Sequence, residues 1–365
     1  MLLINRLNSK QAVHHFDDYF HKLSAVLEAR NKPGCIQVKI KSEPLNLDYD
    51  HPAGCIDQPF HTASIGKLFT AVLVQRLVER KQLFLADPIQ RYISPAWLER
   101  LFVYQNVDYS RYVTIRHLLG HTSGIADYFD GRTTSGASFR KLILTHPQVH
   151  WTPWQLLDFT RENQKAVGMP GRVFNYSDTG YILLGLLVEA VTGKPFGQNL
   201  AEEILLPLEM HDTWLMFCSE PVNKPERRMA KAWIDQVEVS RFESLSSDWA
   251  GGGIVSTTSD LLKFSHALRS GKLIQKQTLD AMDNCSHVFR PGIYYGLGMM
   301  KIRLREFVLL GNLPDLCGYL GILAVHLFHD PSSDAHIILN FGSTSRMRES
   351  FRALFEIIHT LQRMQ

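Results

Sequence analysis

Ser64 and Lys67 stand three residues apart at the start of an apolar segment that contains no proline. From 65 to 78 most positions are apolar, which predicts a helix buried on most of its sides. A spacing of three places the serine and the lysine on one face, one turn apart. A lysine in such a helix needs a partner or loses its charge more readily than in water. A serine beside that amine, at a helix N-terminus, can be deprotonated, so we predict that Ser64 is a nucleophile.

Tyr176 and Asp178 lie between a Pro170-Gly171 turn and an apolar segment over 180–191 that predicts a helix. A tyrosine in that loop could carry a proton between Ser64 and a leaving group once a nearby cation lowers its pKa from about 10. The ordinary alternatives are a loop aromatic packed on the core and, for Asp178, the N-cap of the following helix. Residue types and spacing do not decide between a catalytic and an ordinary role for either Tyr176 or Asp178.

The elements that must position these residues change in type along the chain. Helices are predicted by apolar periodicity over 11–30, 65–78, 114–120, 154–161, 180–191, 204–211 (a short helix or turn), 257–269 and 346–362. Strands are predicted over 35–41, 250–256, 308–310, 321–328 and 336–341. Strands therefore cluster at both ends of the chain, with helices between them.

This order predicts a mixed α/β (α+β) fold with one antiparallel sheet built from both chain termini and flanked by helices. The sheet-containing region would comprise 1–85 and 245–365, and a helical region over 86–244 would be inserted into it. We expect the active site in the cleft between the two regions.

The composition is that of a globular protein, with 45% apolar and 21% charged residues. A formal net charge of +3 gives no sign of a nucleic-acid partner. The five cysteines are scattered without CxxC pairs, which favours a reducing compartment with no disulfide framework or zinc knuckle. The first residues form too short an apolar run for a signal peptide, and no run of about 18 apolar residues predicts a membrane span. We expect a cytoplasmic protein, or an exported one if the N-terminus is a processed end.

Taken together, the motifs resemble the serine β-lactamase-like and penicillin-binding-protein-like family, closest to class C β-lactamases and related esterases and D-peptidases. The resemblance spans roughly residues 35 to 345 and rests on Ser64-Ile-Gly-Lys67, 115–124, Tyr176-Ser-Asp178, 249–264 and 295–298. It implies that Ser64 is the acylated nucleophile, Lys67 its activating amine and Tyr176 the general base and acid. Position 178 would contact the lysine and the substrate. The N–H of Ser64 and an edge strand near the C-terminus would form the oxyanion hole, with no metal or organic cofactor.

Two departures from the family pattern matter. Asp178 stands where the family usually has asparagine, and an ionised Asp178 would hold Lys67 protonated and shift the base role to Tyr176. The edge-strand motif, Lys-Thr-Gly or His-x-Gly in the family, has two possible registers. Leu316 to Gly318 is preferred, with Gly318 leaving room for substrate and the N–H of Tyr319 completing the oxyanion hole. Asn312-Leu313-Pro314 restores a polar residue but loses the glycine.

Leu316 would stand where the family often has a cation, so a substrate carboxylate would bind less well there. This favours neutral esters or amides as substrates. We therefore predict a serine hydrolase that forms an acyl-enzyme on Ser64 and cleaves an ester or amide bond of a small molecule or short peptide. The alternatives are a β-lactamase or D-Ala carboxypeptidase proper, and a non-catalytic ligand-binding relative. The histidines at 326 and 329 are interpreted as structural, no metal site is predicted, and the sequence does not fix the oligomeric state.

Overall fold

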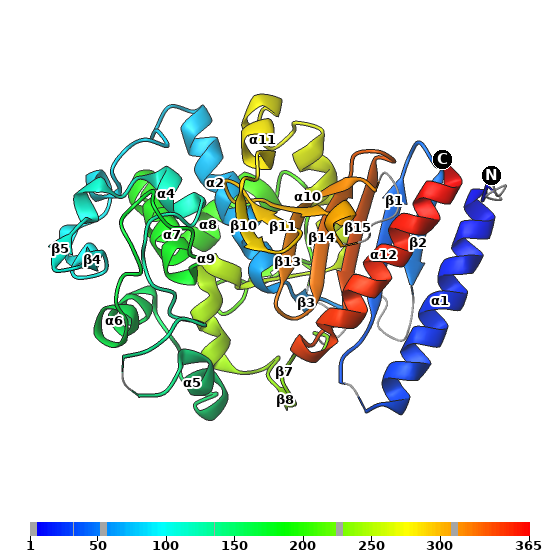
Figure 1. The fold of residues 1–365 in the computed structure, drawn as a ribbon, viewed down its shortest axis with the longest axis horizontal. Coiled ribbons are helices and arrows are strands. Elements are labelled where there is room, and N and C mark those ends of the chain that lie inside the picture. The colour runs from blue at the N-terminus through cyan, green and yellow to red at the C-terminus, as the bar shows by residue number, and fades with distance from the viewer. Residues whose placement is uncertain (1–5, 32, 52–56, 135, 224–228, 308–312) are drawn as a thin grey trace.

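A computed structural model of the chain describes residues 6–31, 33–51, 57–134, 136–223, 229–307 and 313–365. Its centre is an eight-stranded antiparallel sheet in the order β10-β11-β12-β13-β14-β15-β1-β2 (Figure 1). The strands are β1 (Gln37–Ser42), β2 (Leu47–His51), β10 (His287–Arg290), β11 (Ile293–Tyr295), β12 (Met300–Arg303), β13 (Asp315–Gly321), β14 (Val325–Asp330) and β15 (Ala335–Asn340). Pairing of β1 with β15 joins the two ends of the chain, so the predicted sheet is confirmed.

Helices cover both faces of this sheet. Ser265 of α10 (Thr258–Arg269) bonds His336 on one face, and Ser350 of α12 (Met347–Met364) bonds His326 on the other. Next to α12 lies α1 (Ser9–Ala29), whose Phe16 packs against Tyr49 of β2. The sheet residues are buried on both sides because each apolar face meets a helix.

Between β2 and β10 the chain forms mostly helices and short hairpins. The remaining helices are α2 (Gly66–Glu79), α3 (Pro95–Leu98), α4 (Ile115–Leu119), α5 (Phe139–Thr145), α6 (Pro153–Asn163), α7 (Asp178–Thr192), α8 (Phe196–Leu200), α9 (Trp249–Gly252) and α11 (Lys276–Asp283). The short strands are β3 (Phe60–His61), β4 (Val103–Tyr104), β5 (Val107–Asp108), β6 (Trp214–Leu215), β7 (Trp233–Ile234), β8 (Val237–Glu238) and β9 (Ile254–Ser256).

The apolar helix α2 is buried from Gly66 to Gln75, as its composition predicts. Glycines let its neighbours approach it closely. A Cβ added at Gly66 would lie 2.8 Å from Cα of Gly252 in α9, and one at Gly185 of α7 would lie 2.5 Å from Cβ of Ala250. The three helices therefore pack almost backbone to backbone, which fixes α9 beside the start of α2.

Several expectations need correction. The segment 250–256 begins as helix α9 and is a strand only from Ile254, because the glycines before it pack against α2. A π-helical turn (Ala201–Leu205) precedes the predicted helix or turn at 204–211. Cys35 is disulfide-bonded, with its partner outside the described residues, so the expectation of no disulfide is wrong. The predicted strand at 308–310 also lies outside the described residues. In the part of the chain that is described, no helix is both long enough and apolar enough to cross a membrane.

Candidate active site

Ser64 lies in a tight turn between β3 and α2, at the edge of the large sheet. Ala63 adopts a left-handed backbone with φ of 49°, an uncommon conformation outside glycine. Two hydrogen bonds support it: the N–H of Ala63 donates to Nδ1 of His61 at 3.1 Å, and the N–H of Thr62 donates to the carbonyl of Ile254 at 2.9 Å. The turn presents the Ser64 side chain at the wall of a cavity.

Lys67 is fully buried and its ammonium reaches three acceptors. Nζ donates to Oγ of Ser64 at 3.3 Å, to the carbonyl of Gly251 at 2.7 Å, and to Oδ1 of Asp178. Burial lowers the pKa of Lys67, but Asp178 and Tyr176 raise it more, so the net pKa lies above its usual value. The lysine is therefore a protonated amine held between a carboxylate and the serine, as the sequence suggests for an acidic residue at 178.

Tyr176 comes from the loop before α7, and its ring centroid is 5.1 Å from Nζ of Lys67. Burial raises the pKa of Tyr176 and outweighs the lowering effect of Lys67, so the expectation of a lowered tyrosine pKa is wrong. The ring of His121 packs against it in a tilted orientation, with the centroids 4.3 Å apart, and Nδ1 of His121 accepts the N–H of Ser177. Tyr176 is a neutral phenol in a fixed position, and an uncharged histidine supports it.

A chain of phenols leads away from Tyr176. Its hydroxyl lies 3.3 Å from that of Tyr319, which lies 2.7 Å from that of Tyr295, which in turn lies 3.0 Å from that of Tyr181. Tyr181 donates its proton to the carbonyl of Leu119 at 3.2 Å. Because the last proton is committed to a carbonyl, each phenol donates towards Leu119. Tyr176 then donates to Tyr319 and keeps its lone pairs free to accept a proton.

The third motif lies three residues later than the preferred register. Leu316 and Gly318 pair with Ile302 and Met300 of β12, are buried and do not line the cavity, so the structure does not bring these two predicted substrate-binding residues to Ser64. β12 begins at Met300, which pairs with Gly318, so the following part of β13 lacks that neighbour. Periodicity cannot distinguish this paired half of a strand from its open half.

The open half of β13 is Tyr319-Leu320-Gly321. A Cβ at Gly321 would lie 2.8 Å from the carbonyl oxygen of Thr62 and 3.1 Å from Cβ of Ala63, so this strand end runs beside Ser64. Tyr319 does reach the site, through its hydroxyl bond to Tyr176. It stands at the first position of the motif, and Gly321 at the third. For the other predicted register, Asn312 lies outside the described residues.

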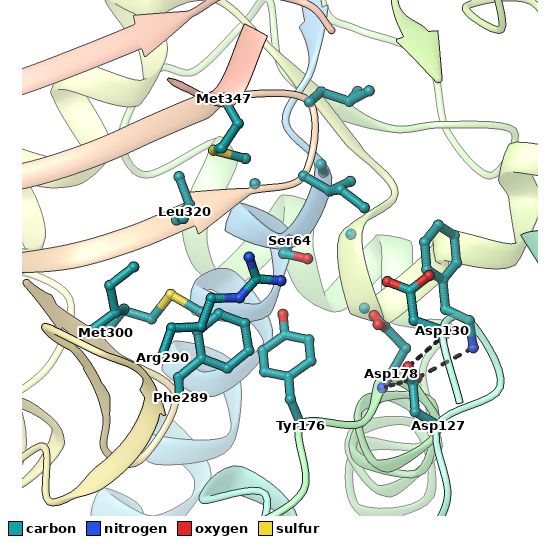
Figure 2. A pocket seen from close by; sticks show the side chains of 18 of the residues that line it. Ser64, Asp127, Asp130, Tyr176, Asp178, Phe289, Arg290, Met300, Leu320 and Met347 are labelled. Atoms are coloured by element: carbon teal, nitrogen blue, oxygen red, sulfur yellow. Dashed lines mark hydrogen bonds between the residues drawn. The ribbon is translucent and has the colours of Figure 1, made fainter. Parts of the chain in front are cut away.

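The cavity beside Ser64 has a volume of about 840 Å³ and two unlike sides. In Figure 2, Asp127, Asp130 and Asp178 lie on one side of Ser64, while Met300, Leu320 and Met347 lie on the other. Arg290 also lines the cavity, from the hairpin of β10 and β11. One substrate could therefore meet polar and apolar surfaces at once.

Two carboxyls lie on the polar side, Asp127 buried and Asp248 half-buried. Oδ1 of Asp127 accepts the N–H of Asp178 at 2.9 Å and so fixes the start of α7. Oδ2 of Asp248 lies 3.3 Å from Nε2 of His61. Burial, and after it the nearby carboxylate of Asp178, raise the pKa of both aspartates to about 7.

A model of the family named Beta-lactamase matches residues 51–304, which is more than half of the chain. The chain belongs to the beta-lactamase family. Its members include serine peptidases, amidases, esterases and acyltransferases.

Individual relatives are more distant. Penicillin-binding protein 4* of Bacillus subtilis is 29% identical over 61% of this chain and 47% of its own length. Monacolin J acid methylbutanoyltransferase of Aspergillus terreus is 27% identical over 72% of this chain and 69% of its own length. The chain spans about half the length of the curated bacterial relatives it matches.

The fold matches solved structures over nearly the whole chain. D-amino acid amidase of Ochrobactrum anthropi SV3 superposes with a TM-score of 0.76 at 22% identity, covering 98% of this chain and 99% of the amidase. EstCE1, a hydrolase with promiscuous acyltransferase activity, superposes with a TM-score of 0.75 at 19% identity, covering 96% and 98% of the two chains. At such identities these matches describe the fold alone.

In this beta-lactamase-family site, sequence reasoning missed the residues His61, Asp127 and Asp248. Asp127 follows closely on the 115–124 motif, yet nothing in its spacing shows that it would bond the start of α7. Asp248 precedes the glycine run of α9 and meets His61, which is far from it in the sequence, only through tertiary packing. These residues are assembled by tertiary contacts, which leave no periodic pattern in the sequence.

One group of side chains in the described residues could hold a metal ion: His329, Asp334 and His336, with ligand atoms within 4.8 Å of one another. Those atoms already have partners, because Nε2 of His329 bonds Asp334 at 2.8 Å and Nδ1 of His336 bonds Ser265 at 2.8 Å. The group lies outside the residues that line the cavity, with His329 opposite the paired part of β13.

Proposed function

We propose that the chain is a serine hydrolase that forms an acyl-enzyme on Ser64 and cleaves ester or amide bonds of small molecules or short peptides. The observation that carries this proposal is the contact of Ser64 with Lys67 at 3.3 Å, at the wall of the cavity. The lysine is fully buried, and nothing in the packing requires a buried ammonium beside a half-exposed serine. Such a pair is costly to fold and is suited to activating a hydroxyl.

The proton path follows from the resting protonation states. Lys67 holds a proton and Tyr176 is neutral, because the pKa of each is raised. Ser64 passes its proton to Nζ as Lys67 passes one to Oδ1 of Asp178, and the serine oxygen bonds the carbonyl carbon. This assigns the base role to the Lys67–Asp178 pair in place of Tyr176.

The remaining steps use Tyr176 and the end of β13. The N–H of Ser64 and an N–H of the Gly321–Ile322 segment bind the oxyanion of the tetrahedral intermediate. Tyr176 turns its hydroxyl away from Tyr319 and gives its proton to the leaving group, and it then receives a proton from Asp178 through Lys67, which restores the starting states. Water then releases the acid from Ser64 by the same route.

The residue at the start of the third motif supports esters and amides over penicillins and D-Ala peptides. Tyr319 stands where a cation would grip a substrate carboxylate, and its phenol is engaged by two other tyrosines.

The test is covalent labelling of the whole protein. A fluorophosphonate should add one label, measured by intact mass, and Ser64→Ala should abolish it. Hydrolysis of p-nitrophenyl esters without turnover of nitrocefin selects an esterase over a β-lactamase. No label and no turnover of either substrate would favour the non-catalytic relative and overturn the proposal.

A further inference from the structure

The apolar side of the cavity is a defined limb formed by Met300, Leu320, Met347, Phe351 and Phe355. None of these side chains carries a charge or donates a hydrogen bond. Met300 and Leu320 come from the sheet, and the other three come from α12 (Figure 2 labels Met300, Leu320 and Met347). The limb is continuous with the space at Ser64, because the same cavity is lined by all of them.

The three residues from α12 form a second apolar stripe on that helix. Met347, Phe351 and Phe355 are spaced by four and are half-buried, whereas the core-facing positions such as Leu354 and Ile358 are fully buried. The stripe covers about 12 Å along the helix axis. Packing of the core therefore leaves this stripe open, and the surface it faces is the cavity.

An aromatic side chain stands at one end of the limb. The ring of Phe307 lies 5.8 Å from that of Phe355 and 6.4 Å from that of Phe351. The other end opens at Leu320, next to Gly321 and the Ser64 turn. The limb is therefore an apolar extension of the cavity, suited to a flexible apolar chain.

The position of Tyr176 decides which part of a substrate the limb receives. The leaving group must lie within reach of the Tyr176 hydroxyl that protonates it. Figure 2 shows Ser64 between Tyr176 and the side chains of Leu320 and Met347. The limb therefore lies on the acyl side of the scissile bond.

We propose that the limb binds the hydrocarbon chain of a medium-length, uncharged acyl group, so that the preferred substrates are acyl esters or amides of that class. This inference rests on the proposed acyl-enzyme chemistry at Ser64. Each methylene moved from water into the limb contributes about fourfold in kcat/KM, the equivalent of about 0.8 kcal/mol.

The experiment compares p-nitrophenyl acetate, butanoate, hexanoate and octanoate on the intact protein. We expect kcat/KM to rise from acetate to octanoate, by up to about fourfold for each added methylene that enters the limb. Met347→Trp, which fills the limb near Ser64, should lower the octanoate-to-acetate ratio, while Phe84→Trp on an exposed residue should leave it unchanged. A ratio that is flat or falls with chain length in the native protein overturns the inference.

A second measurement separates this inference from the proposed function. Titration of N-methyl octanamide into Ser64→Ala, followed by calorimetry, measures binding of the hydrocarbon chain when no acyl transfer can occur. Binding that is lost in Ser64→Ala/Met347→Trp supports the limb even if Ser64 is never labelled. Labelling of Ser64 with no binding and no chain-length preference would overturn the proposal that the limb binds an acyl chain, while the proposed hydrolase function would stand.

Discussion

Lys67 shows how a single buried charge organises this site. Its ammonium has no contact with solvent, and its charge is balanced by the carboxylate of Asp178 and the carbonyl of Gly251. Removing one partner of a buried pair leaves the other uncompensated, which costs more than the pair gains over apolar residues. The pairing therefore sets the protonation state of the lysine, and through it the proton path from Ser64.

Asp178→Asn tests that proton path. Asp178 is the largest cause that raises the pKa of Lys67, so the variant has a lower lysine pKa and no carboxylate to receive a proton. Lys67 must then act as a neutral amine, which exists only above its own pKa. We expect kcat/KM for a p-nitrophenyl ester to fall about 100-fold at pH 7, with the acidic limb of the pH–rate profile moved to higher pH. Asp130→Asn at the exposed mouth is the control, and an unchanged profile in Asp178→Asn would contradict the relay.

Tyr319→Phe tests the phenol chain. The substitution removes the acceptor for the Tyr176 proton, so the Tyr176 hydroxyl can turn away from the orientation that serves Ser64. One neutral hydrogen bond contributes about 1 kcal/mol, so we expect kcat to fall about fivefold with KM little changed. Tyr294→Phe is the matched control, because the Tyr294 hydroxyl bonds Glu306 and is not part of the phenol chain. Equal effects of the two variants would mean that the chain has no positioning role.

At the scale of elements, α9 connects packing to chemistry. Its carbonyls at Ala250 and Gly251 accept from Thr70 and Lys67 of α2, so a shift of α9 moves the acceptors of the catalytic lysine. α9 is held in place by α7, through the close approach at Gly185. The site therefore depends on contacts that no catalytic side chain makes.

Gly185→Ala and Gly180→Ala form a matched pair on α7. A Cβ at Gly185 would lie 2.5 Å from Ala250 and 2.6 Å from the Trp249 ring, whereas one at Gly180 has its nearest neighbour at 3.7 Å. We expect Gly185→Ala to cost about 1–3 kcal/mol of unfolding free energy by overpacking and to reduce with it any hydrolysis of p-nitrophenyl esters. Gly180→Ala should be neutral or stabilising by up to about 1 kcal/mol, because alanine favours the helix. Urea unfolding of both variants measures the difference, and equal midpoints would contradict this account of α7 and α9.

The same scale explains how far the sequence predicts the molecule. Buried helix α2 and the terminal strands follow from local apolar patterns, so they can be read directly. The position of the third motif on β13 cannot be read in this way. Leu316 and Leu320 have similar local surroundings and differ only in whether β12 pairs beside them. The pKa of Tyr176 was also mispredicted, since burial by distant segments outweighs the adjacent lysine. Contacts between regions decide both cases.

At the scale of the whole molecule, the cavity is a place where folding and function conflict. The sheet region and the helical region bury Asp127 and Asp248 next to Asp178, so several carboxyls share a space of low polarity. Buried acids of this kind resist ionisation. A fold optimised for stability alone would replace them, which is consistent with a functional constraint on this part of the cavity.

Asp248→Asn measures that conflict through its pH dependence. Asp248 accepts no hydrogen bond from α9, and folding raises its pKa to about 7. From about pH 4 to pH 7 the folded chain therefore keeps a proton that the unfolded chain releases, so stability falls as pH rises through this window. The variant escapes this loss, and we expect its unfolding free energy to exceed that of the native protein by about 1–2 kcal/mol at pH 8 and by little at pH 5. Thermal unfolding at both pH values, with the exposed Asp18→Asn as the control, checks this; a gain at pH 5 as large as that at pH 8 would show that ionisation of Asp248 is not its source.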